Sequence, residues 1–304
     1  MNHPVLPESA VALTVQRLAR RRFLAQAGML SLGGAAVLTA GARSAFAHEL
    51  DSAAEAAQES AQAQDTVKEI FTAALIAEDL ASTFYYNGLI GAVIQDVNLA
   101  GPGGSATSVS SAGDSGNVGY LRAALTQELQ HAALFRSLLG ISAPTHDPVQ
   151  TFYFPAGTFD SLPAFTGLLD ALENAFIGAY LNAIQEFAAK SANAHRGDGA
   201  WRAPADHAYC KEQLDYFAKV SASIMGIEAE HRVLGRVISG TDPANNLNYE
   251  STDGLNAVYN GSHSAVAALT PFLQPSTGPG FTLETVTLHQ SEVALPITGG
   301  PPSF

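Results

Sequence analysis

Two Glu-x-x-His pairs place a carboxylate and an imidazole where the helical pattern of the sequence requires apolar side chains. The pairs are Glu128–His131 and Glu228–His231. Residues three apart on a helix are neighbours on one face, so both side chains of a pair point the same way. Burying an ionised carboxylate is costly unless it is paired or binds a metal. Either pair alone is typical of a satisfied core histidine, so the chemistry depends on what the other helices supply.

Two further apolar stripes each contain a single glutamate. Glu78 and Glu173 stand where the three- and four-residue spacing of apolar residues predicts a buried side chain. Tyr85 and Tyr180 lie on the same two faces, where each could hydrogen-bond a ligand or relay an electron. A core tyrosine with a bonded hydroxyl is the interpretation we favour. Asp79 is turned about 100° away from Glu78, so we expect it to face solvent.

Together the four stripes supply four carboxylates and two imidazoles. Hard oxygen and nitrogen ligands of this kind suit iron or manganese, and four negative charges offset those of two divalent cations. Without a metal, four buried carboxylates would repel one another and some would have to protonate. The sequence therefore predicts a site for two iron or manganese ions, with Glu128 as a bridging ligand, and assigns no catalytic residue. The predicted metal ligands are Glu78, Glu128, His131, Glu173, Glu228 and His231.

Four long helical patterns must position these residues. They run over about residues 66–98, 121–139, 162–191 and 205–239. A Gly- and Ser-rich loop, 99–118, joins the first two, and a proline-containing stretch, 141–160, joins the second to the third. A loop as long as the second requires an explanation in a compact domain, and a four-helix bundle with one long crossover provides it.

The predicted fold is therefore all-α, with the bundle at residues 64–240. Glu230 is about 200° from Glu228 on the last helix and is expected to face water. Residues 241–304 are predicted to form a mostly irregular C-terminal extension, within which residues 281–288 are β-prone.

The first 47 residues have the composition of a targeting segment. Arg20, Arg21 and Arg22 precede an uncharged run, 23–41, and the small-x-small cleavage signal at 45–47. This pattern resembles a twin-arginine export signal, and the run is too weakly apolar to favour the alternative of a permanent membrane anchor. We therefore expect a signal peptide at 1–47, a linker or helical extension at 48–63, and a periplasmic or extracellular location.

Composition restricts the classes of partner that the protein can bind. The chain is 47% hydrophobic and 14% charged, which is typical of a packed globular protein. Its formal net charge of −13 argues against binding to nucleic acid or to anionic membranes. Cys210 is the only cysteine, so no intrachain disulfide can form. Metal ions are the predicted partners, and a homo-oligomer is left open.

The helix order and the six residues resemble the ferritin-like superfamily. One Glu from each of two helices and a Glu-x-x-His from each of the others is the ligand set of di-iron and di-manganese carboxylate bundles. The second Glu-x-x-His makes the metal set more similar to bacterioferritins and related oxidases than to eukaryotic storage ferritins. A narrower resemblance, to exported bacterial ferritin-like proteins often labelled desiccation-related, rests on residues 77–85, 171–180 and 244–246.

The resemblance implies two functions that the same six residues support. In the first, the protein is a redox-active di-metal protein, for which oxidation of ferrous iron, peroxide disproportionation and substrate oxidation are all compatible. In the second, it is an exported desiccation or stress protein that uses the bundle as a non-catalytic scaffold, with the metal structural or absent. Metal content, and the optical spectrum after addition of Fe(II) and oxygen, separate the two.

Overall fold

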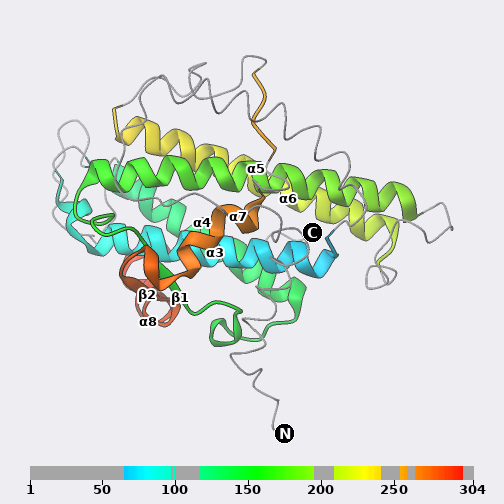
Figure 1. Ribbon diagram of the computed structural model, residues 1–304, viewed down its shortest axis with the longest axis horizontal. Coiled ribbons are helices and arrows are strands. Elements are labelled where there is room, and N and C mark those ends of the chain that lie inside the picture. Colours follow the sequence, from blue (N-terminus) through cyan, green and yellow to red (C-terminus); the bar gives the residue numbers. More distant parts are fainter. Residues whose placement is uncertain are drawn as a thin grey trace, which may run out of the picture.

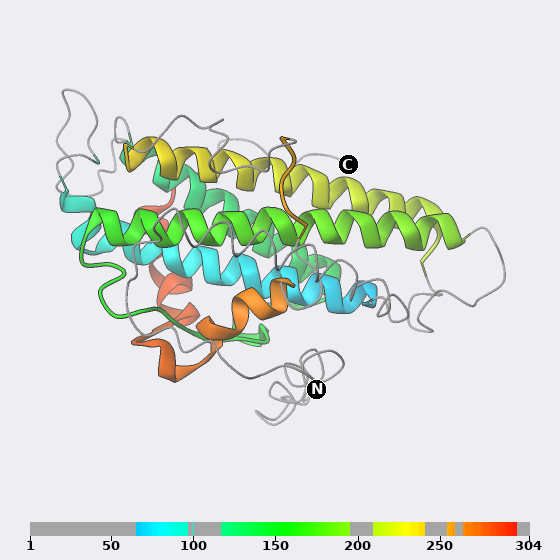
Figure 2. The same cartoon turned by 45° about the horizontal axis from the view of Figure 1, so that its top comes forward.

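Four long helices lie side by side and form a bundle (Figures 1 and 2). The computed structural model describes residues 65–96, 99, 117–194, 209–240, 254–258 and 264–296. The expected signal peptide and linker lie outside the described residues, as does most of the 99–118 loop. The predicted all-α bundle is confirmed, and its long helices are α3 (Val67–Ile90), α4 (Asn117–Leu139), α5 (Leu162–Ala194) and α6 (Lys211–Ile238).

Local sequence signals start two of these helices. At α3 the Thr66 hydroxyl accepts from the backbone N–H of Glu69, and the Glu69 carboxylate accepts from that of Thr66, which is a capping box. At α5 the Ser161 hydroxyl accepts from the N–H of Ala164 at 3.4 Å, as expected for a cap. Both caps satisfy amide groups that the first helical turn leaves without partners.

Several helix ends differ from the sequence prediction. α5 continues past residue 191 to Ala194, and α6 begins at Lys211 instead of about 205, since the described residues 209 and 210 are not helical. α3 stops at Ile90 instead of about residue 98, because the extended backbone of Gly91 redirects the chain into a short 3₁₀ helix, η1 (Ala92–Gln95). That turn buries Val93 and Ile94, which the helical pattern had assigned to α3. α4 begins at Asn117, four residues before the predicted start.

The helices pair as the predicted topology requires. α3 packs against α4 and α5 packs against α6, while α3 also contacts α5 and α4 contacts α6. The crossover between α4 and α5 contains a 3₁₀ helix, η2 (Pro144–His146), and strand β1 (Thr151–Tyr153). β1 pairs antiparallel with β2 (Gly280–Thr282), so the crossover is joined to the C-terminal part of the chain.

The C-terminal part is more regular than its sequence suggests. It contains α7 (Ala265–Leu269), the 3₁₀ helices η5 (Thr270–Leu273) and η6 (Pro275–Thr277), β2, and α8 (Leu283–Val293). The β prediction for 281–288 is wrong beyond residue 282, because the Thr282 hydroxyl caps α8 by accepting from the N–H of Thr285. Leu283, Val286 and Val293 then become buried along one helical face.

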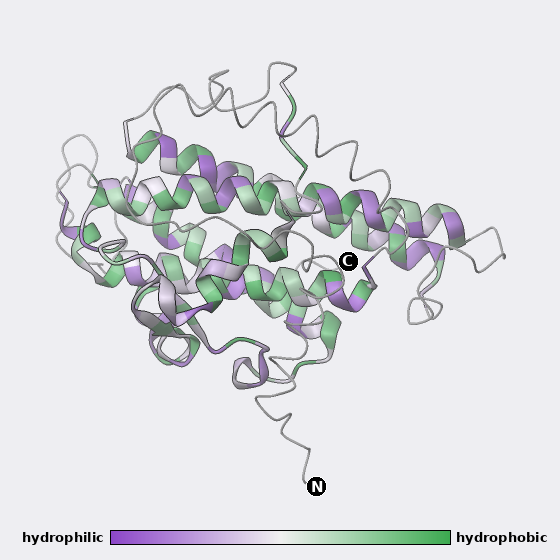
Figure 3. Cartoon of the chain, viewed as in Figure 1, coloured by the Kyte–Doolittle hydropathy of each residue, from purple (hydrophilic) through white to green (hydrophobic). Residues whose placement is uncertain are grey.

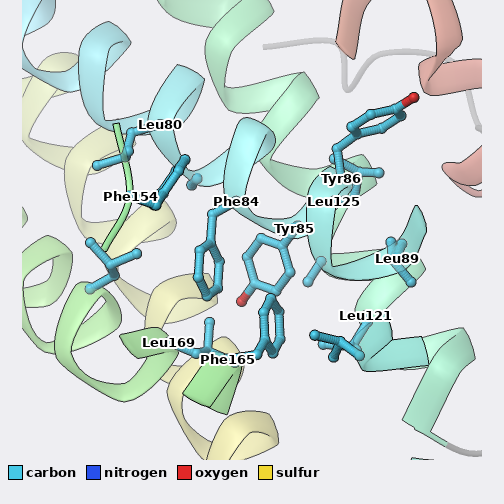
Figure 4. Packing of buried hydrophobic residues seen from close by; sticks show 14 of the residues in the cluster. Leu80, Phe84, Tyr85, Tyr86, Leu89, Leu121, Leu125, Phe154, Phe165 and Leu169 are labelled. Carbon is cyan, nitrogen blue, oxygen red and sulfur yellow. The ribbon is translucent and has the colours of Figure 1, made fainter. Parts of the chain in front are cut away.

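Two hydrophobic clusters fill the bundle interior. At one end Phe84 stacks on Phe165 with ring centroids 4.4 Å apart, beside Tyr85 (Figure 4). At the other end Phe71 contacts the rings of Phe135, Phe187 and Phe217. Hydrophobic and hydrophilic residues are interspersed along all four helices (Figure 3). Among the helices that the structure describes, none combines the length and hydropathy needed to cross a membrane.

Candidate metal centre

The six side chains singled out from the sequence meet between the four long helices. They form two overlapping groups of four, and within each group one ligand atom per residue lies within 4.8 Å of the others. The first group is Glu78, Glu128, His131 and Glu228, and the second is Glu128, Glu173, Glu228 and His231. Because Glu128 and Glu228 belong to both groups, the arrangement provides two adjacent positions with two shared carboxylates.

All four carboxylates of the cluster are buried. Glu128 and Glu173 are 0% exposed, and Glu78 and Glu228 are 2% and 1% exposed. His231 is 3% exposed, whereas the side chain of His131 is 13% exposed. Four carboxylates in such a place require a counter-charge, because unpaired buried charges are strongly unfavourable.

Both histidines turn Nδ1 toward the carboxylates. Nδ1 of His131 is 3.2 Å from Oε2 of Glu78 and 3.5 Å from an oxygen of both Glu128 and Glu228. Nδ1 of His231 is 2.9 Å from Oε1 of Glu128 and 3.4 Å from Oε2 of Glu228. Each position therefore has one imidazole nitrogen and carboxylate oxygens directed at a common centre.

The cluster contains buried polar atoms without hydrogen-bond partners in the described structure. They are both carboxylate oxygens of Glu128 and of Glu228, Oε2 of Glu173, and Nδ1 of His231. Buried polar atoms without partners are rare in folded proteins, so such a concentration requires an explanation. Carboxylate oxygens and imidazole nitrogens are ligands that iron and manganese accept. The residues present therefore fit a pair of such ions.

The electrostatics of the metal-free cluster favour the protonated forms of four of its six side chains. Burial raises the pKa of Glu78 and of Glu173 well above the ordinary range, and neighbouring carboxylates add to the effect. Burial would also raise the pKa of Glu128, but His231 and His131 outweigh it and hold that pKa below its usual value. Burial opposes the charged form of both histidines, yet the surrounding carboxylates raise the pKa of each well above normal. Protons and metal ions therefore compete for these side chains.

Two tyrosines hold the carboxylates that are not shared. The Tyr85 hydroxyl donates to Oε1 of Glu173 at 2.7 Å, and the Tyr180 hydroxyl donates to Oε1 of Glu78. Burial raises the pKa of both tyrosines well above the ordinary value, so both remain protonated donors. Both hydroxyls are bonded, but their partners are two of the predicted ligands. The geometry therefore matches the alternative of a hydrogen bond to a ligand, and not the favoured interpretation of a purely structural core tyrosine.

The second nitrogen of His231 also has a partner, which sequence reasoning missed. Nε2 of His231 is 2.9 Å from Oε1 of Gln127, which lies on α4 directly before Glu128. The corresponding position before Glu228 is Ile227, which cannot accept a hydrogen bond. The two Glu-x-x-His pairs therefore differ in whether the histidine has a side-chain hydrogen-bond partner on the facing helix. The sequence shows this difference only when α4 is known to face α6.

The expectation that Asp79 faces solvent is wrong. Asp79 is 1% exposed, and Oδ1 accepts from Nη2 of Arg136 at 2.5 Å. Nε of Arg136 donates to Asp147 of the crossover at 2.7 Å, so one arginine joins α3, α4 and the crossover. Burial raises the pKa of Asp79, and Arg136 opposes that rise. Glu230, by contrast, is exposed as expected.

Comparison with known proteins matches this part of the chain to one family. Residues 66–197 match the model of a ferritin-like domain. The matched segment includes α3, α4, the crossover and α5, and thus Glu78, Glu128, His131 and Glu173. No curated protein and no solved structure matches the chain. Over the segment that contributes four of the six clustered side chains, the chain is similar to the ferritin-like domain.

Proposed function

We propose that the chain binds two iron or manganese ions between its four long helices and acts on ferrous iron, oxygen or peroxide. The observation that carries the proposal is the overlap of the two groups of four ligands. Glu128 and Glu228 are common to both groups, which is the arrangement that a pair of ions bridged by carboxylates requires.

Each residue has a distinct part in the proposed centre. Glu78 and His131 would hold one ion, Glu173 and His231 the other, and Glu128 and Glu228 would contact both. When bound, the metal pair would supply reversible one-electron redox chemistry. Tyr85 and Tyr180 orient the outer carboxylates through their hydroxyl groups. The four carboxylates are buried, and burial strengthens the charge interactions inside the centre.

Anaerobic titration of metal-free protein with Fe(II) tests the proposal. We expect about two equivalents per chain, followed by a change in the optical spectrum when oxygen is added. The double substitution Glu128→Ala with His131→Ala should abolish binding, because it removes one shared and one terminal ligand. Gln130→Ala on the same helix is the matched control, since Gln130 is exposed and belongs to neither group of ligands.

The same titration separates the redox function from the scaffold alternative. Metal that binds and raises the melting temperature without any change on exposure to oxygen or peroxide would support a structural role. Binding of trace metal only, or full metal binding by the Glu128→Ala, His131→Ala variant, would contradict the proposed centre itself.

We further propose export by the twin-arginine route and a role in stress or desiccation protection outside the cytoplasm. The support for export comes from Arg20, Arg21 and Arg22, the uncharged run 23–41 and the small residues at 45–47. The protective role rests on the resemblance of residues 77–85, 171–180 and 244–246 to desiccation-related proteins. Replacing Arg20, Arg21 and Arg22 with Lys should retain the full-length precursor in the cytoplasm of its host. Cell fractionation then reads out the result, and unchanged export would contradict this part of the proposal.

A further inference from the structure

A small cavity, partly open to solvent and lined mostly by apolar residues, lies between α3 and α5, next to the proposed metal centre. Its volume is about 80 Å³. The two facing helices contribute six alanines to its lining, which leave space that larger side chains would fill, and α7 contributes Val266, Ala268 and Leu269. The alanines are Ala73, Ala74, Ala77, Ala175, Ala179 and Ala183.

The cavity reaches the side chains that hold one of the metal positions. Tyr180 lines it, and the Tyr180 hydroxyl donates to Glu78. Ala77, the residue before Glu78, and Phe176, one helical turn after Glu173, line it too. The cavity is therefore lined on one side by residues that also border the metal cluster.

Size and polarity restrict what the cavity can hold. An apolar cavity of about 150 Å³ holds benzene or xenon, so the space between α3 and α5, about half that volume and lined mostly by apolar side chains, suits a smaller apolar molecule. The described residues that line it include no Lys, Arg or His, while Asp65 and Glu69 are among them. An anionic ligand would meet carboxylates and no cation, whereas an uncharged diatomic molecule pays no such electrostatic cost.

We propose that this cavity binds dioxygen and delivers it to the metal centre from between α3 and α5. The proposal rests on the proposed function, because the metal pair is the destination of the gas. Binding in the cavity itself requires no metal, so the two ideas can fail separately.

Xenon is a direct probe because it is apolar, small and inert. With metal-free full-length protein under xenon pressure, ¹²⁹Xe NMR or a xenon-soaked crystal should show one site between Ala74, Ala175 and Tyr180. Ala175→Leu should abolish that site by filling the cavity. Ala171→Leu is the matched control, because Ala171 is exposed one turn earlier on the same helix. Absence of xenon from the cavity, or unchanged xenon binding in Ala175→Leu, would overturn the proposal.

Oxygen kinetics test the delivery step. In Fe(II)-loaded protein, Ala175→Leu should raise the KM for oxygen several-fold while leaving Fe(II) stoichiometry and the rate at saturating oxygen nearly unchanged. Ala74→Leu, on the opposite wall of the cavity, provides a second variant in case Ala175→Leu does not fold. A KM for oxygen equal to that of the unmodified protein in whichever variant folds and retains two metals would count against delivery.

Two outcomes distinguish this inference from the proposed function. Xenon binding in a protein that never oxidises Fe(II) would support the gas-binding site and contradict the proposed function. Competition between xenon and 1-hexanol would overturn the inference, because it would show that the cavity accepts an organic molecule larger than a diatomic gas.

Discussion

The hydroxyl of Tyr85 on α3 lies 2.7 Å from Oε1 of Glu173 on α5 and donates a hydrogen bond between the two helices. Tyr180 on α5 donates the reciprocal bond to Glu78 on α3. Each tyrosine follows the glutamate of its own helix by seven residues, or about two helical turns. Each helix therefore supplies one carboxylate to the cluster and one donor to the carboxylate of the other helix.

Loss of the Tyr85 hydroxyl should weaken metal binding. Tyr85→Phe leaves Glu173 without its hydrogen-bond donor. Removing a residue that hydrogen-bonds to a metal ligand lowers metal affinity about 10- to 100-fold. A competition titration of Mn(II) against a chelator measures the change. Tyr86→Phe is the matched control, because the Tyr86 hydroxyl points away from Tyr85 (Figure 4). An equal loss of affinity in both variants would show that the effect does not come from the bond to Glu173.

The metal-free protein should lose stability as pH rises above about 4.5. The pKa values of Glu78 and Glu173 are raised in the folded state above their ordinary value of 4.5, so these groups bind more protons folded than unfolded. Their contribution to the free energy of unfolding is complete below the pKa of the unfolded state. It is lost as the pH rises through the pKa of the folded state. The raised pKa values of His131 and His231 act in the same direction above about pH 6.5. Glu128, with a lowered pKa, loses its contribution only below about pH 4.5.

Thermal unfolding of chelator-treated protein between pH 5 and pH 8 measures this dependence. We expect the melting temperature to fall across the range, and saturating Mn(II) to restore it most at pH 8, where fewer protons must be displaced. The double variant Glu78→Gln, Glu173→Gln should show a flatter curve, because two of the titrating groups are gone. A melting temperature of the metal-free protein that rises from pH 5 to pH 8 would contradict the assigned direction.

The helices and the six clustered residues follow from the sequence because both depend on periodicity within one helix. A stripe that repeats every three or four residues shows which side chains share a face, and a polar residue inside it is visible without knowing the neighbour. The environment of Asp79 was not predictable in this way, because its burial depends on Arg136 reaching across from α4. The start of α8 at Leu283 also escaped prediction, since the Thr282 cap outweighs the β propensity of the residues that follow.

Breaking the buried pair between Asp79 and Arg136 should destabilise the metal-free protein. Removing one partner of a buried ion pair costs about 3–5 kcal/mol, because the remaining charge loses its compensation. In Asp79→Ala, Arg136 still has its ion pair with Asp147. We therefore expect the loss of stability to lie near the lower end of that range. Urea unfolding of metal-free protein gives the value, with Glu230→Ala as an exposed control expected within about 0.5 kcal/mol of the unmodified protein.

A second substitution identifies the origin of that loss. Asp79→Leu combined with Arg136→Met and Asp147→Leu replaces all three charges of this buried network with apolar groups, and such replacements are often neutral or stabilising. The triple variant should therefore be more stable than Asp79→Ala. If the triple variant is the less stable of the two, the Arg136 charge is not what destabilises the single variant.

The bond between Gln127 and His231 should make the two metal positions unequal. Because the Gln127 oxygen can only accept, it favours the hydrogen on Nε2 of His231, so Nδ1 is the nitrogen that would give up its proton to bind a metal. His131 faces no equivalent of Gln127, since Ile227 stands in the corresponding position, and its side chain is more exposed. We therefore expect a tighter site at Glu173 and His231 than at Glu78 and His131.

Gln127→Leu should reduce this difference by weakening the tighter site about 10- to 100-fold. A two-site Co(II) titration followed by absorbance resolves both constants without relying on turnover. Gln130→Leu on the exposed side of α4 is the control and should leave both constants unchanged. Equal weakening of the two sites by Gln127→Leu would show that Gln127 supports the bundle as a whole instead of orienting His231, because only a bond to that imidazole acts on one position alone.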